Sequence, residues 1–237
     1  MIATGNFVFI HLHKSGGSFI NAALMRYFRN AIKLGYHLPI SELPSRYAHL
    51  PLLGTVRNPW SYYVSWYEFQ KTLNEPTFIW RVFSDEGRLG FEGTVQRMLY
   101  CGQDRNTVQQ LLRQAPENYS STGVNITRSH LRGLHEEKGG WYTFLFRHMY
   151  GNSPIELVQT ENLRRGFYEF LVRRMEVSDE LKAYIFDGAK LNSTPHSCYS
   201  DYYSPALVKD VGVQENEIVG RFGYLFGHEP EPSSRTD

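Results

Sequence analysis

The sequence contains very little cysteine, since Cys101 and Cys198 are the only two among 237 residues. Two thiols so far apart make neither a disulfide framework nor a zinc knuckle, because both need several closely spaced cysteines. We therefore expect a protein of a reducing compartment, and no cluster of Cys, His and carboxylate residues indicates a metal site.

Long apolar runs and a strong net charge are also lacking. No stretch approaches the roughly 20 apolar residues of a membrane-spanning helix, and the first predicted strand begins too close to Met1 to leave room for a signal peptide. The formal net charge is only +1, so any anion must be bound locally. These features predict a protein without a membrane span and without a nucleic-acid partner.

The size and composition are those of one ordinary globular domain. The chain has 237 residues, 41% of them hydrophobic, and it shows no internal repeat. This length is typical of a single α/β domain. We therefore expect residues 1–237 to form one domain.

An apolar run near the N-terminus passes into a loop with one cation, two hydroxyls and two glycines, and then into a helical pattern. The loop is Lys14, Ser15, Gly16, Gly17 and Ser18. The pattern predicts a strand, an anion-binding loop and a helix, because glycines let backbone N–H groups approach an anion closely. Ser18 is expected to cap the helix, and Lys14 adds a full positive charge. The alternative is a plain strand-to-helix turn without a ligand.

A second apolar stretch ends in Arg57, Asn58 and Pro59 and is followed by another helical pattern. Proline is favoured in the first turn of a helix, so we expect a strand followed directly by a helix. Helical spacing places Ser61 and Ser65 one turn apart on one face. An arginine at a strand end and a serine in the next helix can bind one phosphate, because a guanidinium offers forked donors. The alternative is an arginine that pairs with a surface carboxylate.

Together the two motifs resemble those of sulfotransferases that use 3′-phosphoadenosine 5′-phosphosulfate (PAPS). In that family a Lys-Ser/Thr-Gly-Gly/Thr-Ser/Thr loop holds the 5′-phosphosulfate, and an Arg-Asn/Asp-Pro strand end with a serine eight residues on holds the 3′-phosphate. The resemblance implies an α/β, P-loop-like three-layer fold with a central, mostly parallel sheet flanked by helices. It also implies the donor-binding residues, which are Lys14, Ser15, Gly16, Gly17, Ser18, Phe19, Arg57 and Ser65.

Sulfuryl transfer to a hydroxyl needs a base within hydrogen-bond reach of the acceptor. His37, Glu42 and His49 are the candidates between the two motifs, and His11 and His13 are further candidates in the first motif's loop. Residues 35–43 are similar to the segment that carries the catalytic histidine in the heparan sulfate 2-O and 6-O sulfotransferases, which implies the base role for His37. Glu42 is the reserve, because other carbohydrate sulfotransferases use a glutamate in this part of the chain. The structural alternative is that His37 only bonds a loop carbonyl.

Residues 73–140 show short helical patterns with polar breaks, and we expect this insertion to cover the acceptor side of the site. Its cations would hold an anionic sugar or, alternatively, face solvent. They are Arg88, Arg105, Arg128, His130, Arg132 and Lys138.

The remaining segments are predicted from pattern and resemblance. Residues 155–159 are predicted to be a strand, with a capped helix start at Thr160 and an architectural role for Glu161. In relatives the loop that corresponds to residues 189–196 closes over the nucleotide, so Lys190 or His196 would assist there. Residues 228–237 are expected to be a frayed tail.

The resemblance thus predicts a transferase that moves the sulfuryl group from PAPS to a hydroxyl, in a carbohydrate or a small metabolite, with Lys14 and His37 as catalytic residues and no metal. Because Golgi relatives normally carry a membrane anchor, it also implies a bacterial cytoplasmic protein. One alternative is a P-loop small-molecule kinase, but Walker A loops have the lysine after the glycines. The others are a non-catalytic nucleotide-binding member of the fold and a structural protein in which both loops are ordinary turns.

Overall fold

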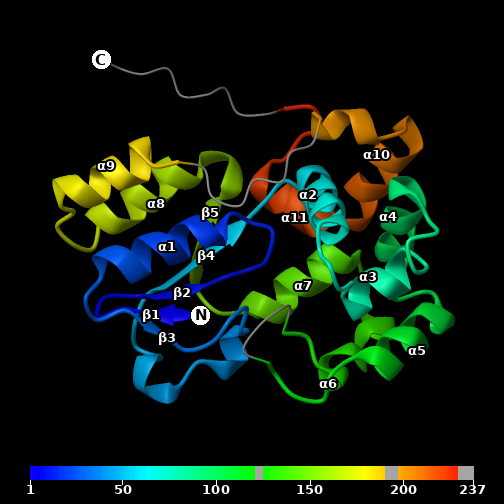
Figure 1. Cartoon of the computed structure of the whole chain (residues 1–237), viewed down its shortest axis with the longest axis horizontal. Helices are drawn as coiled ribbons and strands as arrows, with labels where there is room; N and C mark the ends of the chain where they lie inside the picture. The colour runs from blue at the N-terminus through cyan, green and yellow to red at the C-terminus, as the bar shows by residue number, and fades with distance from the viewer. Residues whose placement is uncertain (121–124, 190–196, 229–237) are drawn as a thin grey trace.

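The structure is a computed structural model that describes residues 1–120, 125–189 and 197–228. These residues form an α/β protein with one five-stranded sheet and eleven α-helices (Figure 1). The strands are β1 (Ile2–Ala3), β2 (Val8–Ile10), β3 (Ile32–Lys33), β4 (Leu52–Val56) and β5 (Ile155–Gln159). The helices are α1 (Gly17–Tyr27), α2 (Pro59–Lys71), α3 (Phe78–Phe83), α4 (Phe91–Leu99), α5 (Arg105–Gln114), α6 (Arg128–Leu131), α7 (Trp141–Tyr150), α8 (Leu163–Val172), α9 (Asp179–Asp187), α10 (Pro205–Gln214) and α11 (Asn216–Phe222).

The sheet is mixed, with the strand order β3-β1-β2-β4-β5. Strands β2, β4 and β5 pair in parallel, whereas β1 is antiparallel to both of its neighbours. The reversal arises at a tight turn in which the Thr4 hydroxyl accepts hydrogen bonds from the backbone N–H groups of Asn6 and Phe7. The prediction of a mostly parallel sheet is therefore corrected to a mixed, partly parallel sheet.

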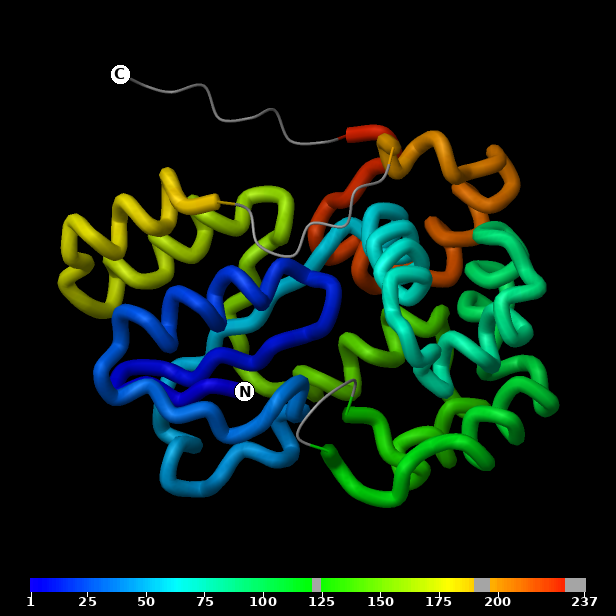
Figure 2. Tube along the Cα trace, in the orientation of Figure 1, coloured from blue at the N-terminus to red at the C-terminus, as the bar shows by residue number. Residues whose placement is uncertain are grey.

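Both faces of the sheet are covered by helices, because the strand side chains alternate between two apolar cores. In β2, Val8 and Ile10 belong to one core, whereas Phe9 belongs to the other. Helices α1, α8 and α9 cover the Phe9 side, and α2, α7 and the helices beyond them cover the opposite side. The tube in Figure 2 shows the first group apart from the helices of residues 78–114.

The two helices that follow the motifs begin as local sequence chemistry requires. Helix α2 starts with Pro59 in its first turn, and the Asn58 side chain accepts a hydrogen bond of 3.0 Å from the Trp60 N–H. Helix α1 buries the apolar face formed by Phe19, Ile20, Ala23 and Leu24, and it ends at Tyr27. The chain leaves the helix there to form β3 at the edge of the sheet.

The other predicted elements are largely confirmed. Helices α3, α4 and α5 lie where residues 73–140 showed helical patterns, and β5 covers residues 155–159. The turn after β5 differs from the prediction, because a 3₁₀ turn at Thr160–Asn162 precedes α8 and no side chain caps either element. Within the described parts of the chain, no helix combines the length and apolar character needed to cross a bilayer.

Candidate functional site

The two motifs lie at the carboxyl ends of neighbouring parallel strands. Strand β2 leads into α1 on one face of the sheet, and β4 leads into α2 on the other face. Such a reversal between adjacent strands is a topological switch point, and in open α/β sheets ligands bind outside the strand ends at this point. The fold therefore makes the loop after β2 and the end of β4 the candidate ligand-binding site.

The two strands separate before they end. The β2–β4 pairing stops at Ile10 and Gly54, whereas β4 stays paired with β5 as far as Val56. Beyond this point, two tyrosine hydroxyls of α7 form hydrogen bonds with the backbone of Thr55 in β4 and of Arg57 just after it. Tyr150 accepts from the Thr55 N–H at 3.0 Å and donates to its carbonyl at 2.6 Å, and Tyr142 bonds the backbone N–H of Arg57 at 2.9 Å.

The loop after β2 is fixed by hydroxyl groups on both sides. The Ser15 hydroxyl donates to the Leu12 carbonyl and lies 2.7 Å from Thr55 Oγ1. The Thr160 hydroxyl lies 2.8 Å from the Ser15 carbonyl and 3.0 Å from that of Val56. The Ser15 side chain is thus used for structure, so that Ser15 can contribute only its backbone to anion binding.

Gly16 and Gly17 are each required for a different structural reason. Gly16 has a φ of 79° and is the N-cap of α1, without a side-chain cap. The prediction that Ser18 caps the helix is therefore wrong, because the helix begins one residue before it. A Cβ atom at Gly17 would lie 2.1 Å from Cδ2 of His11, so this close approach requires glycine. The first N–H groups of α1 point out of the helix end, where a helix favours anions.

Three of the predicted donor-binding residues, Lys14, Ser18 and Phe19, differ in whether their side chains are available to bind a ligand. The Lys14 ammonium lies 4.0 Å from the ring centroid of Phe69 in α2, and burial together with the Arg57 charge lowers the pKa of Lys14 to about 8. The half-buried Ser18 hydroxyl has no hydrogen-bond partner among the described residues. The Phe19 ring is stacked on Tyr184, so only the Phe19 backbone belongs to the helix end.

Arg57 joins the two motifs directly. Its Nη1 donates to the Lys14 carbonyl at 3.1 Å, and its Nε donates to the Ser61 hydroxyl at 3.0 Å. Ser65, one turn further along α2, is only 7% exposed, and its hydroxyl has no hydrogen-bond partner in the described parts of the chain. Its oxygen is not one of the fully enclosed polar atoms that lack a partner in the described ranges, so it can hydrogen-bond to a polar ligand atom.

A buried carboxylate fixes the backbone that follows Arg57. Glu161 accepts a hydrogen bond of 2.7 Å from the Asn58 N–H and one of 3.2 Å from the Tyr224 hydroxyl. Burial raises the pKa of Glu161. The Asn58 side chain also donates to the Leu225 carbonyl at 3.2 Å. The backbone that follows Arg57 is thus held by two distant parts of the sequence, at Glu161 and at residues 224–225.

His37 is 7% exposed and has a left-handed backbone with a φ of 49°. Its Nδ1 donates to the His11 carbonyl at 2.8 Å, and this hydrogen bond assigns the lone pair to Nε2. Burial lowers the pKa of His37 to about 4, and the nearby positive charges of Lys33 and Lys14 act in the same direction. At neutral pH His37 is therefore a neutral imidazole of defined tautomer.

The other candidates near His37 are placed differently. The ring centroids of His11 and His37 lie 4.2 Å apart with the planes tilted by 49°, and Nδ1 of His11 accepts a hydrogen bond from the Asn21 amide at 2.9 Å. His13 is buried, and its Nε2 has no hydrogen-bond partner within residues 1–120, 125–189 and 197–228. Glu42 and His49 are exposed.

The cations of the helical insertion are not gathered into one site. Arg88 pairs with Asp85 at 2.8 Å, and Arg128 pairs with Glu117. The predicted contributions of Lys190 and His196 fall outside the described residues, as do residues 229–237 of the expected tail. In the described ranges, no three His, Cys, Asp or Glu side chains are grouped to hold a metal ion.

Four hydroxyl residues of the site were missed by the sequence interpretation: Thr55, Tyr142, Tyr150 and Thr160. One weak signal existed, since the two tyrosines are eight residues apart and therefore share a face of α7.

The fold and the site define an α/β protein in which a lysine loop and an arginine strand end meet at a switch point of the sheet. No protein-family model, curated protein or solved structure matches the chain.

Proposed function

We propose that the protein is a sulfotransferase that transfers the sulfuryl group of PAPS to a hydroxyl of an acceptor, either a carbohydrate or a small metabolite. The observation that supports this best is the hydrogen bond of 3.1 Å from Arg57 to the Lys14 carbonyl. This bond joins the loop after β2 to the end of β4. The residues that we propose to bind opposite ends of one nucleotide therefore lie close together. The switch point between β2 and β4 also supports a P-loop-like, three-layer arrangement.

In this proposal the two motifs divide the donor between them. The backbone N–H groups from Ser15 to Phe19 and the Ser18 hydroxyl bind the 5′-phosphosulfate at the N-terminus of α1. Arg57 and Ser65 bind the 3′-phosphate. Ser61 orients the guanidinium through Nε, which adds a positioning residue to the predicted set.

The reaction forms one bond to sulfur, breaks one bond to sulfur and transfers one proton. The acceptor oxygen forms a bond to sulfur while the bond from sulfur to the bridging oxygen of the 5′-phosphate breaks. That oxygen keeps the electron pair, and Lys14 with the backbone N–H groups stabilises its negative charge. The proton of the acceptor hydroxyl moves to Nε2 of His37. The product is 3′-phosphoadenosine 5′-phosphate (PAP).

His37 suits the role of base through its tautomer more than through its basicity. The bond from Nδ1 to the His11 carbonyl leaves the Nε2 lone pair for the acceptor proton. A pKa of about 4 makes a weak base in the protein without donor. Bound PAPS brings several negative charges near the imidazole, and negative charge raises the pKa of a histidine.

Calorimetry of PAP and adenosine 5′-phosphate tests the donor assignment. Arg57→Ala removes the charge proposed to bind the 3′-phosphate, so PAP affinity falls at least about tenfold. The affinity for adenosine 5′-phosphate, which lacks that phosphate, stays the same. Arg46→Ala, at an exposed arginine outside both motifs, is the control. Equal PAP affinities of Arg57→Ala and the unaltered protein would refute the 3′-phosphate site.

A turnover assay with PAPS and a mixture of hydroxyl compounds tests the base. His37→Ala should bind PAP normally and transfer no sulfate, because only the proton acceptor is removed. If the variant remains active, the base is Glu42 or His49. A protein that is stabilised against heat by ATP with Mg²⁺ and not by PAP is a kinase instead.

A further inference from the structure

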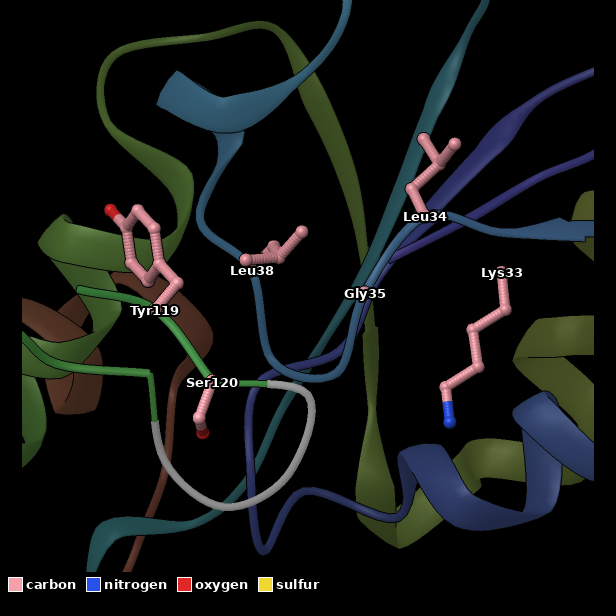
Figure 3. Close-up of a pocket in the computed structure, with 6 residues that line it drawn as sticks. All are labelled: Lys33, Leu34, Gly35, Leu38, Tyr119 and Ser120. Carbon is pink, nitrogen blue, oxygen red and sulfur yellow. The ribbon is translucent and has the colours of Figure 1, made fainter.

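A pocket of about 450 Å³ is lined by residues that lie on both sides of His37 in the sequence, although His37 itself is not part of the lining. It is lined by Lys33, Leu34, Gly35, Leu38, Tyr119 and Ser120 (Figure 3). Pockets that bind small molecules have volumes of about 300–1,000 Å³. The volume is therefore large enough for a compound of one or two rings.

His37 is held close to the loop after β2 by its hydrogen bond to the His11 carbonyl, and in the sequence it is a neighbour of the pocket lining. Gly35 and Leu38, which flank it in the sequence, both line the pocket. The positive charges of Lys33, in the pocket wall, and Lys14, in the donor loop, both act on His37.

The two walls of the pocket are joined by one buried amide. Asn125 is 3% exposed, and its Nδ2 donates to the carbonyls of Tyr36 and Ser120. Its Oδ1 accepts from the Ser120 N–H at 2.9 Å. Because Tyr36 immediately precedes His37, the wall at Ser120 and the segment with the proposed base are held at a fixed separation. Such a preformed pocket lowers the cost of ordering a ligand.

The lining indicates the chemistry of the occupant. Leu34, Leu38 and the Tyr119 ring supply apolar surface, and the Ser120 hydroxyl in the lining donates to Asn125 Oδ1 at 3.3 Å. Among the described residues Lys33 is the one charged residue in the lining, and Figure 3 shows it across the pocket from Leu38 and Tyr119, with its side chain running downward. A densely anionic chain would need several cations here.

On the basis of the proposed function, we propose that this pocket binds the acceptor, and that the acceptor is a small hydroxyl compound with an apolar ring or chain and little negative charge. The sulfated polysaccharides of the heparan type do not meet this description. The proposal thus selects the small-metabolite branch of the two acceptor classes.

Transfer from radiolabelled PAPS to three probes tests this. The probes are 2-naphthol, octyl β-glucoside and heparan sulfate. Ser120→Trp places a bulky ring in the pocket wall at an exposed position, and Leu34→Trp does so from the opposite wall. Asn118→Trp, exposed and outside the lining, is the matched control. Saturation-transfer NMR of the two small probes with the PAP complex measures binding without turnover.

We expect at least one small probe to bind and to receive sulfate. Ser120→Trp and Leu34→Trp should raise its KM about tenfold or more, while PAP affinity and the behaviour of Asn118→Trp stay unchanged. Transfer to heparan sulfate alone, small-probe kinetics that both tryptophans leave unaltered, or a PAP complex that binds neither small probe would overturn the proposal. Absence of PAP binding would refute the proposed function itself, whatever the small probes do.

Discussion

The pH dependence of folding stability tests the environment of His37 without any ligand. Burial lowers the pKa of His37 from 6.5 to about 4. Between these values the unfolded chain binds the proton more tightly than the folded protein, so acid favours unfolding. The stability of the protein with neutral His37 is therefore fully present above pH 6.5 and is lost as the pH falls toward 4.

The loss can be worked from the two pKa values. Since one pKa unit corresponds to about 1.4 kcal/mol, His37 alone lowers the free energy of unfolding by about 2 kcal/mol at pH 5 and by about 3 kcal/mol below pH 4. The variant His37→Asn removes the titrating ring and keeps the geometry. Asparagine tolerates a φ of 49°, and its amide can donate to the His11 carbonyl as Nδ1 does.

Urea unfolding between pH 7.5 and pH 5, followed by tryptophan fluorescence, measures the effect. The free energy of unfolding of His37→Asn should fall about 2 kcal/mol less than that of the unaltered protein over this interval. His49→Asn, at an exposed histidine, should fall as much as the unaltered protein does. Parallel pH curves for the unaltered protein and His37→Asn would show that His37 is not held as a buried neutral imidazole.

Two further substitutions test other parts of the site. Lys14→Ala removes the charge that we propose to stabilise the leaving oxygen, so kcat should fall by about 100-fold or more while calorimetric PAP affinity changes far less. An unaltered kcat would remove Lys14 from the mechanism. Gly17→Ala would bring a Cβ atom within 2.1 Å of the His11 ring, and urea unfolding should show a loss of about 1–3 kcal/mol. Gly90→Ala, where a Cβ atom meets nothing within 4 Å, serves as its control, and equal stability of the two variants would contradict the crowding.

The local half of the fold was predictable from the sequence, because turn and capping chemistry acts over a few residues. Asn58 and Pro59 start α2 as expected. The mixed sheet was not predictable, since β1 and β3 have two residues each and carry no periodic pattern. Ser18 was predicted to be the N-cap of α1 because serine side chains are good caps. In the structure Gly16, with a left-handed backbone, is the N-cap, so the helix begins at Gly17.

In the site, too, residues that are close in sequence could be predicted, and contacts between distant residues could not. The two motifs could be found because their residues are consecutive, but the groups that fix them are far away in sequence. Thr55 lies 40 positions from Ser15, Tyr150 lies 95 from Thr55, and Thr160 lies 145 from Ser15. No pattern in one sequence encodes such pairings, because each depends on which strands become neighbours.

The contact between Asn58 and the Leu225 carbonyl has a consequence for biosynthesis. These residues are 167 positions apart. At about 5–20 residues per second, a ribosome needs roughly 10–30 s to pass from one to the other. A nascent chain therefore exposes the arginine motif well before its final support has been translated. The hydrogen bond that holds the Asn58 side chain therefore forms only after almost the whole chain has been translated.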